Sequence, residues 1–102
     1  MKLIKKLSDR IEEELEDAEC YAKMAIEYRD EYPELARIAN NLSAQELDHM
    51  SALHTIVVQT IDQYRRTNGE PPENMKAIYQ YLHNKHIEHA AKVNVLRSMY
   101  KT

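Results

Sequence analysis

The chain has 102 residues, 30% of them charged, and a formal net charge of −3. Because 17 acidic and 14 basic residues are mixed along it, no basic surface that binds nucleic acid is expected. A single cysteine, Cys20, excludes an intramolecular disulfide framework, and no apolar run approaches the about 20 residues of a membrane span. We therefore expect a cytoplasmic protein with one domain over residues 1–102.

Composition and periodicity both predict an all-α chain of three helices. One Gly and three Pro leave few residues that interrupt a helix. The first helix should end before Pro33, because a residue that precedes proline avoids helical angles. Pro33 should open the second helix, the Asn68-Gly69 pair should close it, and Pro72 should open the third. The helices are expected at about residues 3–30, 33–66 and 72–100.

The short turn after the first helix predicts that the first two helices pack as a long antiparallel hairpin. At 1.5 Å per residue the second helix is about 50 Å long, and the third helix should fold back across the hairpin. Three helices of this length would form a small core as a monomer and leave much amphipathic surface exposed. We therefore expect a homodimer or a larger homo-oligomer.

Two ionisable residues interrupt the apolar stripe of the second helix. Positions 46 and 49 should continue the stripe into the core, but they hold Glu46 and His49. Buried ionisable groups cost several kcal/mol unless they are paired or bind something, so this placement indicates a metal site. A spacing of three puts both side chains within reach of one ion. The stripe consists of Leu35, Ile38, Leu42, Leu53, Ile56, Val57 and Ile61.

Polar residues of the other two helices fall at the same level. Helical spacing places Glu14 on the inner stripe of the first helix, and His86 and His89 on that of the third. Counted from the two turns, all three lie within about one helical turn of Glu46 and His49 in an antiparallel bundle. Carboxylates and imidazoles in one layer suit divalent iron, manganese or zinc.

Two other interpretations are open at this stage. The same groups can form a buried polar network without an ion, which would fix the register and partner choice of a non-enzymatic helical assembly module. A structural zinc site is favoured instead if His86 and His89 join His49 in a closed coordination shell.

The first two helices resemble the ligand helices of the ferritin-like superfamily of di-iron carboxylate proteins, and especially those of rubrerythrins and encapsulated ferritins. In that family a ligand Glu precedes a Tyr by seven residues, which corresponds here to Glu14 and Tyr21. The family's Glu-x-x-His helix corresponds to Glu46 and His49. The resemblance covers roughly residues 7–61.

The resemblance implies a di-iron site and a way to complete it. A full ferritin fold repeats the hairpin within one chain, whereas this chain holds one hairpin, and encapsulated ferritins complete their site across a two-fold dimer. By analogy, two copies of Glu14, Glu46 and His49 would build one site in a four-helix bundle at a dimer interface. Tyr21 would hold a ligand carboxylate by a hydrogen bond.

The resemblance also leaves a second geometry open, in which His86 and His89 complete the site within one chain. In either geometry the implied activity is that of a ferroxidase, which oxidises ferrous iron with oxygen or peroxide for storage or detoxification. Iron is the expected metal, with manganese or zinc as alternatives. Whether a shell protein encloses the assembly is not determined by the sequence.

Overall fold

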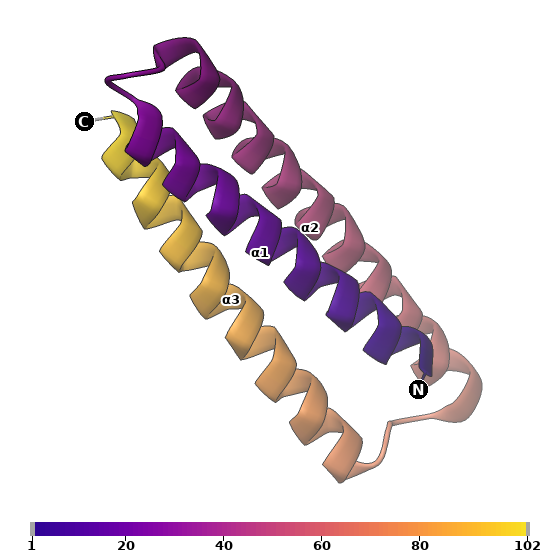
Figure 1. Cartoon of the computed structure of the whole chain (residues 1–102). Helices are drawn as coiled ribbons and strands as arrows, with labels where there is room; N and C mark the ends of the chain where they lie inside the picture. The colour runs from indigo at the N-terminus through magenta and orange to yellow at the C-terminus, as the bar shows by residue number, and fades with distance from the viewer. Residues whose placement is uncertain (1, 102) are drawn as a thin grey trace.

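The computed structural model describes residues 2–101, which form three α-helices joined by short turns (Figure 1). Within residues 2–101 there is no strand, so the prediction of an all-α chain with three helices is confirmed. None of the three helices is both long and apolar enough to cross a bilayer. The bundle measures 55 × 18 × 18 Å. The helices are α1, Lys2–Tyr28; α2, Pro33–Asn68; and α3, Glu73–Lys101.

Local sequence explains where the helices begin and end. Pro33 lies in the first turn of α2, where its missing N–H would have no helical partner. Gly69 closes α2, because its N–H donates to the Arg65 carbonyl at 2.9 Å while its φ of +79° is one that other residues rarely adopt. The Pro72 carbonyl accepts hydrogen bonds from two backbone N–H groups in the first turn of α3. The predicted roles of Pro33, Gly69 and Pro72 are thus confirmed.

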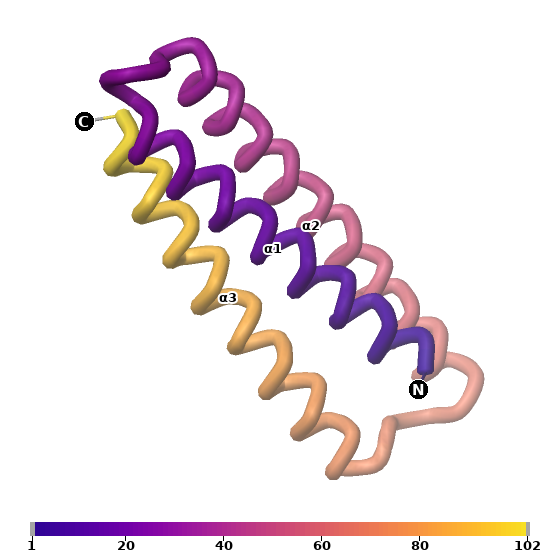
Figure 2. Tube along the Cα trace, in the orientation of Figure 1, coloured from indigo at the N-terminus to yellow at the C-terminus, as the bar shows by residue number. Residues whose placement is uncertain are grey.

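α1 lies between the other two helices and packs against both, whereas α2 and α3 contact each other little (Figures 1 and 2). α2 runs antiparallel to α1, as predicted for the hairpin, and α3 runs parallel to α1 (Figure 2). The larger buried apolar side chains come mainly from α1, with one from α3. They are Ile4, Ile11, Leu15 and Val93.

Small residues form the contact between α1 and α2, which we call the α1–α2 seam. Small side chains let two helix axes approach closely. The Ser43 hydroxyl also donates a hydrogen bond of 2.8 Å to the Ala18 carbonyl across the seam. The seam consists of Ala18, Ala22, Ala25, Ala36, Ala39 and Ser43, none more than 2% exposed.

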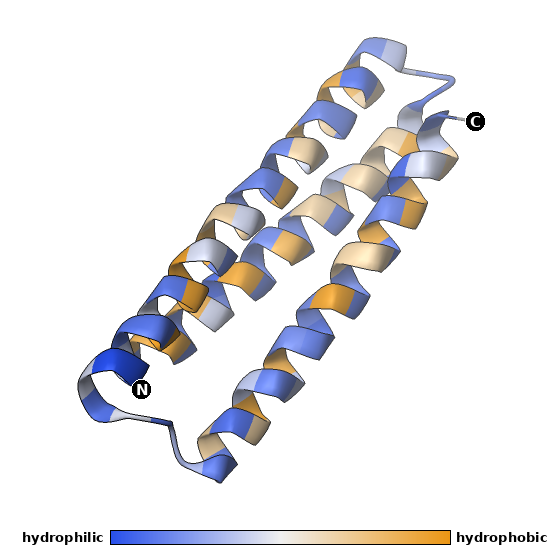
Figure 3. Ribbon diagram, turned by 180° about the vertical axis from the view of Figure 1, so that it is seen from behind, coloured by the Kyte–Doolittle hydropathy of each residue, from blue (hydrophilic) through white to orange (hydrophobic). Residues whose placement is uncertain are grey.

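The apolar stripe predicted to form the core side of α2 is only partly buried, because Leu42, Leu53, Val57 and Ile61 are half-buried and the other three residues face outward. Leu35, Ile38 and Ile56 are 43%, 47% and 44% exposed. Their predicted burial within this chain is therefore wrong, because α1 packs on the neighbouring face of α2, where the small seam residues allow a closer approach. Figure 3 shows the result, with hydrophobic and hydrophilic positions interleaved along all three helices. The outer face of the α1–α2 hairpin is thus partly apolar.

Candidate metal centre

Glu14 is a charged residue on the buried side of α1. It lies one helical turn after Ile11 and before Ala18, and its side chain is only 8% exposed. A carboxylate this buried needs a partner, and one of its oxygens, Oε1, accepts a hydrogen bond of 2.7 Å from Arg10 Nη2. Tyr21 is partly buried two turns further along α1. The predicted placement of Glu14 inside the stripe is confirmed.

Glu46 and His49 approach Glu14 from the neighbouring helix α2. His49 Nδ1 lies 3.4 Å from Glu14 Oε2 and 3.6 Å from Glu46 Oε2. Both distances exceed the about 2.7–3.2 Å of an ordinary N–H···O hydrogen bond, so the three groups are close without pairing tightly. One ligand atom from each residue lies within 4.8 Å of the other two. The structure therefore brings Glu14, Glu46 and His49 together.

The donor atoms of this cluster fit a divalent transition metal. Two carboxylates and one imidazole combine the oxygen and nitrogen ligands that iron, manganese and zinc accept. The three side chains are buried to different degrees: that of His49 is 60% exposed, that of Glu46 17% and that of Glu14 8%. An ion bound here would neutralise carboxylates that are partly removed from water, and it would face the solvent on the His49 side.

His86 and His89 lie elsewhere, so the geometry in which α3 completes this cluster within one chain does not match the structure. They are close to Glu12 on α1 rather than to Glu14. Glu12 and Glu14 are two residues apart, and two residues turn a helix by about 200°. The two glutamates therefore point to different sides of α1, one toward α3 and the other toward the outer face of α2.

His89 instead joins α3 to α1 in a second polar cluster, which we call the α1–α3 clamp and define as Glu12, Glu19, His86 and His89. His89 Nδ1 lies 2.9 Å from Glu12 Oε1, and Nε2 lies 2.9 Å from Glu19 Oε1. Both ring nitrogens thus lie at hydrogen-bond distance from carboxylate oxygens, so the ring bridges two glutamates of α1. The sequence analysis missed Glu12 and Glu19, although their spacing of seven places them on one face.

Two other members of the α1–α3 clamp, Glu19 and His86, have lowered pKa values, each for a different reason. The pKa of Glu19 is lowered to about 2, first by a hydrogen bond from Lys23 and further by His89 and Lys92. Burial lowers the pKa of His86, against the opposing effect of Glu12. The fold therefore favours the charged form of Glu19 and disfavours the protonated form of His86 at this helix contact.

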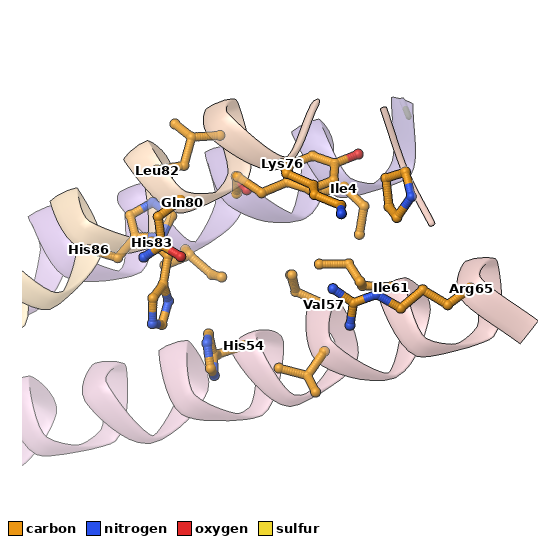
Figure 4. A pocket seen from close by; sticks show the side chains of 15 residues that line it. Ile4, His54, Val57, Ile61, Arg65, Lys76, Gln80, Leu82, His83 and His86 are labelled. Carbon is orange, nitrogen blue, oxygen red and sulfur yellow. The ribbon is translucent and has the colours of Figure 1, made fainter. Parts of the chain in front are cut away.

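A groove lies between α2 and α3 over α1 (Figure 4). Its cavity of about 430 Å³ is lined mostly by apolar residues, with Arg65 and Lys76 among its polar groups. The His54 and His83 rings face each other across it and stack with 4.9 Å between their centroids. Burial, and then the neighbouring His83, lower the pKa of His54. No sequence prediction had brought these two histidines together.

Comparison of this chain with protein-family models, curated proteins and solved structures found no match.

Proposed function

We propose that this chain is a ferritin-like iron-binding protein that oxidises ferrous iron at Glu14, Glu46 and His49. The observation that carries the proposal is the convergence of their three ligand atoms within 4.8 Å, around a nearly buried carboxylate. The resemblance of residues 7–61 to ferritin-like proteins assigns ligand roles to the same three residues. The proposal places the protein in the cytoplasm, where the exposed, free Cys20 stays reduced.

Ferrous iron is the substrate of the proposed reaction. A donor set of two carboxylates and one imidazole leaves coordination positions open to an oxidant. Two ferrous ions each lose one electron, and one dioxygen molecule takes up both electrons and two protons to become hydrogen peroxide. Manganese and zinc suit the same ligands, but zinc has no redox chemistry and would serve only a structural role.

A second copy of the chain is the proposed partner that completes the site. Leu35, Ile38 and Ile56 share the face of α2 that carries His49, since they recur with it at helical spacing, and each is more than 40% exposed. A half-exposed apolar stripe around a polar site is typical of a subunit interface. In a two-fold homodimer on this face, Glu14 and its neighbours would be present twice, which gives the six-ligand set of a di-iron protein.

The exposed stripe also favours a second candidate function, that of a non-enzymatic assembly module. In that case the polar residues would fix register at the interface, and the protein would dimerise without an ion. A structural zinc site has less support, because His86 and His89 belong to the α1–α3 clamp and do not join His49.

An anaerobic ferrous titration followed by exposure to air tests the proposal. The wild type should bind about two iron ions per dimer and show a ferric absorbance rise faster than buffer alone. Glu46→Gln keeps the size of the side chain but removes its charge, so it should lose both signals. Glu73→Gln is the matched control, because the Glu73 side chain is 92% exposed at the far end of α3 and should change neither.

Each other outcome has a distinct meaning. About one zinc ion per chain after purification without chelator would identify a structural site. A dimer that binds no metal would identify the assembly module, and an oxidation rate no faster than buffer would remove the enzymatic claim.

Ile38→Glu should convert the dimer to monomer in sedimentation, whereas Val95→Glu should not, because Val95 is also exposed but lies on α3.

A further inference from the structure

Arg10 holds the most buried acidic group of the candidate site. It lies one helical turn before Glu14 on α1, and its Nη2 donates to Glu14 Oε1 at 2.7 Å. Its other terminal nitrogen, Nη1, pairs with the exposed Glu13. The Arg10 side chain is 51% exposed, whereas that of Glu14 is 8% exposed. A half-exposed guanidinium thus supplies the counter-charge of a carboxylate that is nearly removed from water.

The two oxygens of Glu14 face different partners. Oε1 accepts from Arg10, and Oε2 lies 3.4 Å from His49 Nδ1, on the side of the proposed metal site. While Arg10 stays in place, Oε2 is the oxygen of Glu14 that faces the proposed ion, and the charge on Oε1 is shared with the guanidinium. A carboxylate that is shared by two ions, or that chelates one, needs both oxygens. The fixed positive charge also repels an incoming cation in a region of reduced dielectric constant.

We propose that Arg10 is an internal counter-cation that competes with metal ions for Glu14. It stabilises the metal-free chain by neutralising the buried carboxylate, and it engages one of the two oxygens of Glu14 until the guanidinium moves away. Such a movement is feasible, because the side chain is half-exposed and keeps Glu13 as a partner outside the site. The proposal rests on the proposed function, since it assumes that cations bind at Glu14, Glu46 and His49.

The competing role for Arg10 predicts the opposite result. If the guanidinium only oriented Glu14 toward the ion, its removal would weaken metal binding. Under competition, its removal strengthens binding, because the ion no longer displaces a charge-assisted hydrogen bond. The sign of the change in affinity therefore separates the two roles.

Calorimetric titration of the full-length chain with Mn²⁺, which is stable in air, provides the test. Arg10→Met keeps the apolar stem but removes the charge and the donors, and it should tighten Mn²⁺ binding by about tenfold. Arg10→Lys keeps a positive charge and should bind nearly as the wild type does. Lys5→Met is the matched control: it removes a cation from an exposed pair with Asp9 on the same helix and should leave the affinity unchanged.

Thermal melting gives a second readout that does not depend on affinity alone. Without metal, Arg10→Met should melt below the wild type, because Glu14 loses its counter-charge, and saturating Mn²⁺ should raise its melting temperature more than that of the wild type. Arg10→Gln serves if the Met variant does not fold, with the same expected signs.

Failure of the inference and failure of the proposed function are distinguishable. If the wild type binds Mn²⁺ and Arg10→Met binds it equally or more weakly, competition by Arg10 is refuted while the metal site stands. If neither the wild type nor any Arg10 variant binds Mn²⁺ or Fe²⁺, both proposals fail. Binding by Arg10→Met alone would support competition in its strongest form.

Discussion

The metal-site cluster of Glu14, Glu46 and His49 and the α1–α3 clamp are built from the same chemical groups at the same level of α1, but they are arranged differently. In the clamp, one imidazole lies 2.9 Å from each of two carboxylates, so these groups satisfy one another. In the metal-site cluster, the imidazole is 3.4 and 3.6 Å from its two carboxylates, and the His49 side chain is 60% exposed. Composition alone therefore does not distinguish a ligand set from a structural ion pair.

From this difference we infer that the clamp stabilises the fold, whereas the polar atoms of Glu14, Glu46 and His49 are not satisfied by one another. The clamp lies where two helices of the same chain already pack, and its charges are paired within the molecule. The metal-site cluster lies on a face bordered by exposed apolar residues, and its His49 side chain is 60% exposed. Matched mutations in the two clusters test this comparison most directly. A mutation in one cluster should change metal affinity, and a mutation in the other should change the free energy of unfolding.

The largest expected effect is on metal affinity. His49→Ala should weaken Fe²⁺ or Mn²⁺ binding by at least about a hundredfold, which is the upper end of what outer-shell partners of a metal contribute. His89→Ala should leave the affinity within about threefold of the wild type, since the clamp is not part of the ligand set. Equilibrium dialysis with metal analysis measures both. Equal losses of metal affinity in the two variants would show that the two clusters do not differ in metal binding.

The effect on folding should be reversed. His89→Ala should lower the free energy of unfolding by about 1–3 kcal/mol, because Glu12 and Glu19 lose the imidazole nitrogens that contact them between α1 and α3. His49→Ala should change it by no more than about 0.5 kcal/mol in metal-free protein, because its side chain is mostly exposed. Urea unfolding followed by circular dichroism measures both. If His49→Ala were the more destabilising change, the structural role assigned to the clamp would be wrong.

Acid should weaken the helix contacts in two separate pH ranges. The pKa values of His54 and His86 are lowered from 6.5 in the folded chain, so the unfolded chain binds protons first and stability falls as the pH drops below 6.5. The lowered pKa of Glu19 contributes stability above pH 4.5, which is lost as the pH falls toward 2. Unfolding free energies measured in steps from about pH 8 to pH 3 would show both ranges.

A matched variant assigns the upper of these two ranges. His54→Phe keeps an aromatic ring opposite His83 but cannot bind a proton, so the loss of stability just below pH 6.5 should be smaller than in the wild type. An unchanged pH dependence in this variant would show that burial of His54 is not its cause.

The smallest expected effect concerns the α1–α2 seam, which carries no charged pair. Ser43→Ala removes the hydrogen bond to the Ala18 carbonyl and should cost about 0.5–1 kcal/mol, because that carbonyl keeps its own helical hydrogen bond. Metal affinity should stay unchanged. A loss of both stability and metal binding would show that the geometry of the α1–α2 seam controls the metal-site cluster.

The helices and the level at which the polar groups meet could both be predicted from residue order. Proline and Asn-Gly positions predicted the turns, and a rise of 1.5 Å per residue placed Glu14, Glu46, His49, His86 and His89 in one layer. The contacts between Glu14 and His49, and between Glu12 and the two α3 histidines, confirm that level. Distance along a helix depends only on residue count, so it can be read from the sequence.

The face of each helix that is turned inward depends on packing between the helices and could not be predicted in the same way. Each residue rotates the face by about 100°, so a difference of two residues separates Glu12 from Glu14 and assigns them to different clusters. The apolar stripe of α2 was predicted as the core side, but Leu35, Ile38 and Ile56 are exposed because the small residues of the seam allow α1 to approach α2 more closely on the neighbouring face. Periodicity shows which residues share a face, whereas the choice among competing faces depends on how side chains from distant segments fit together.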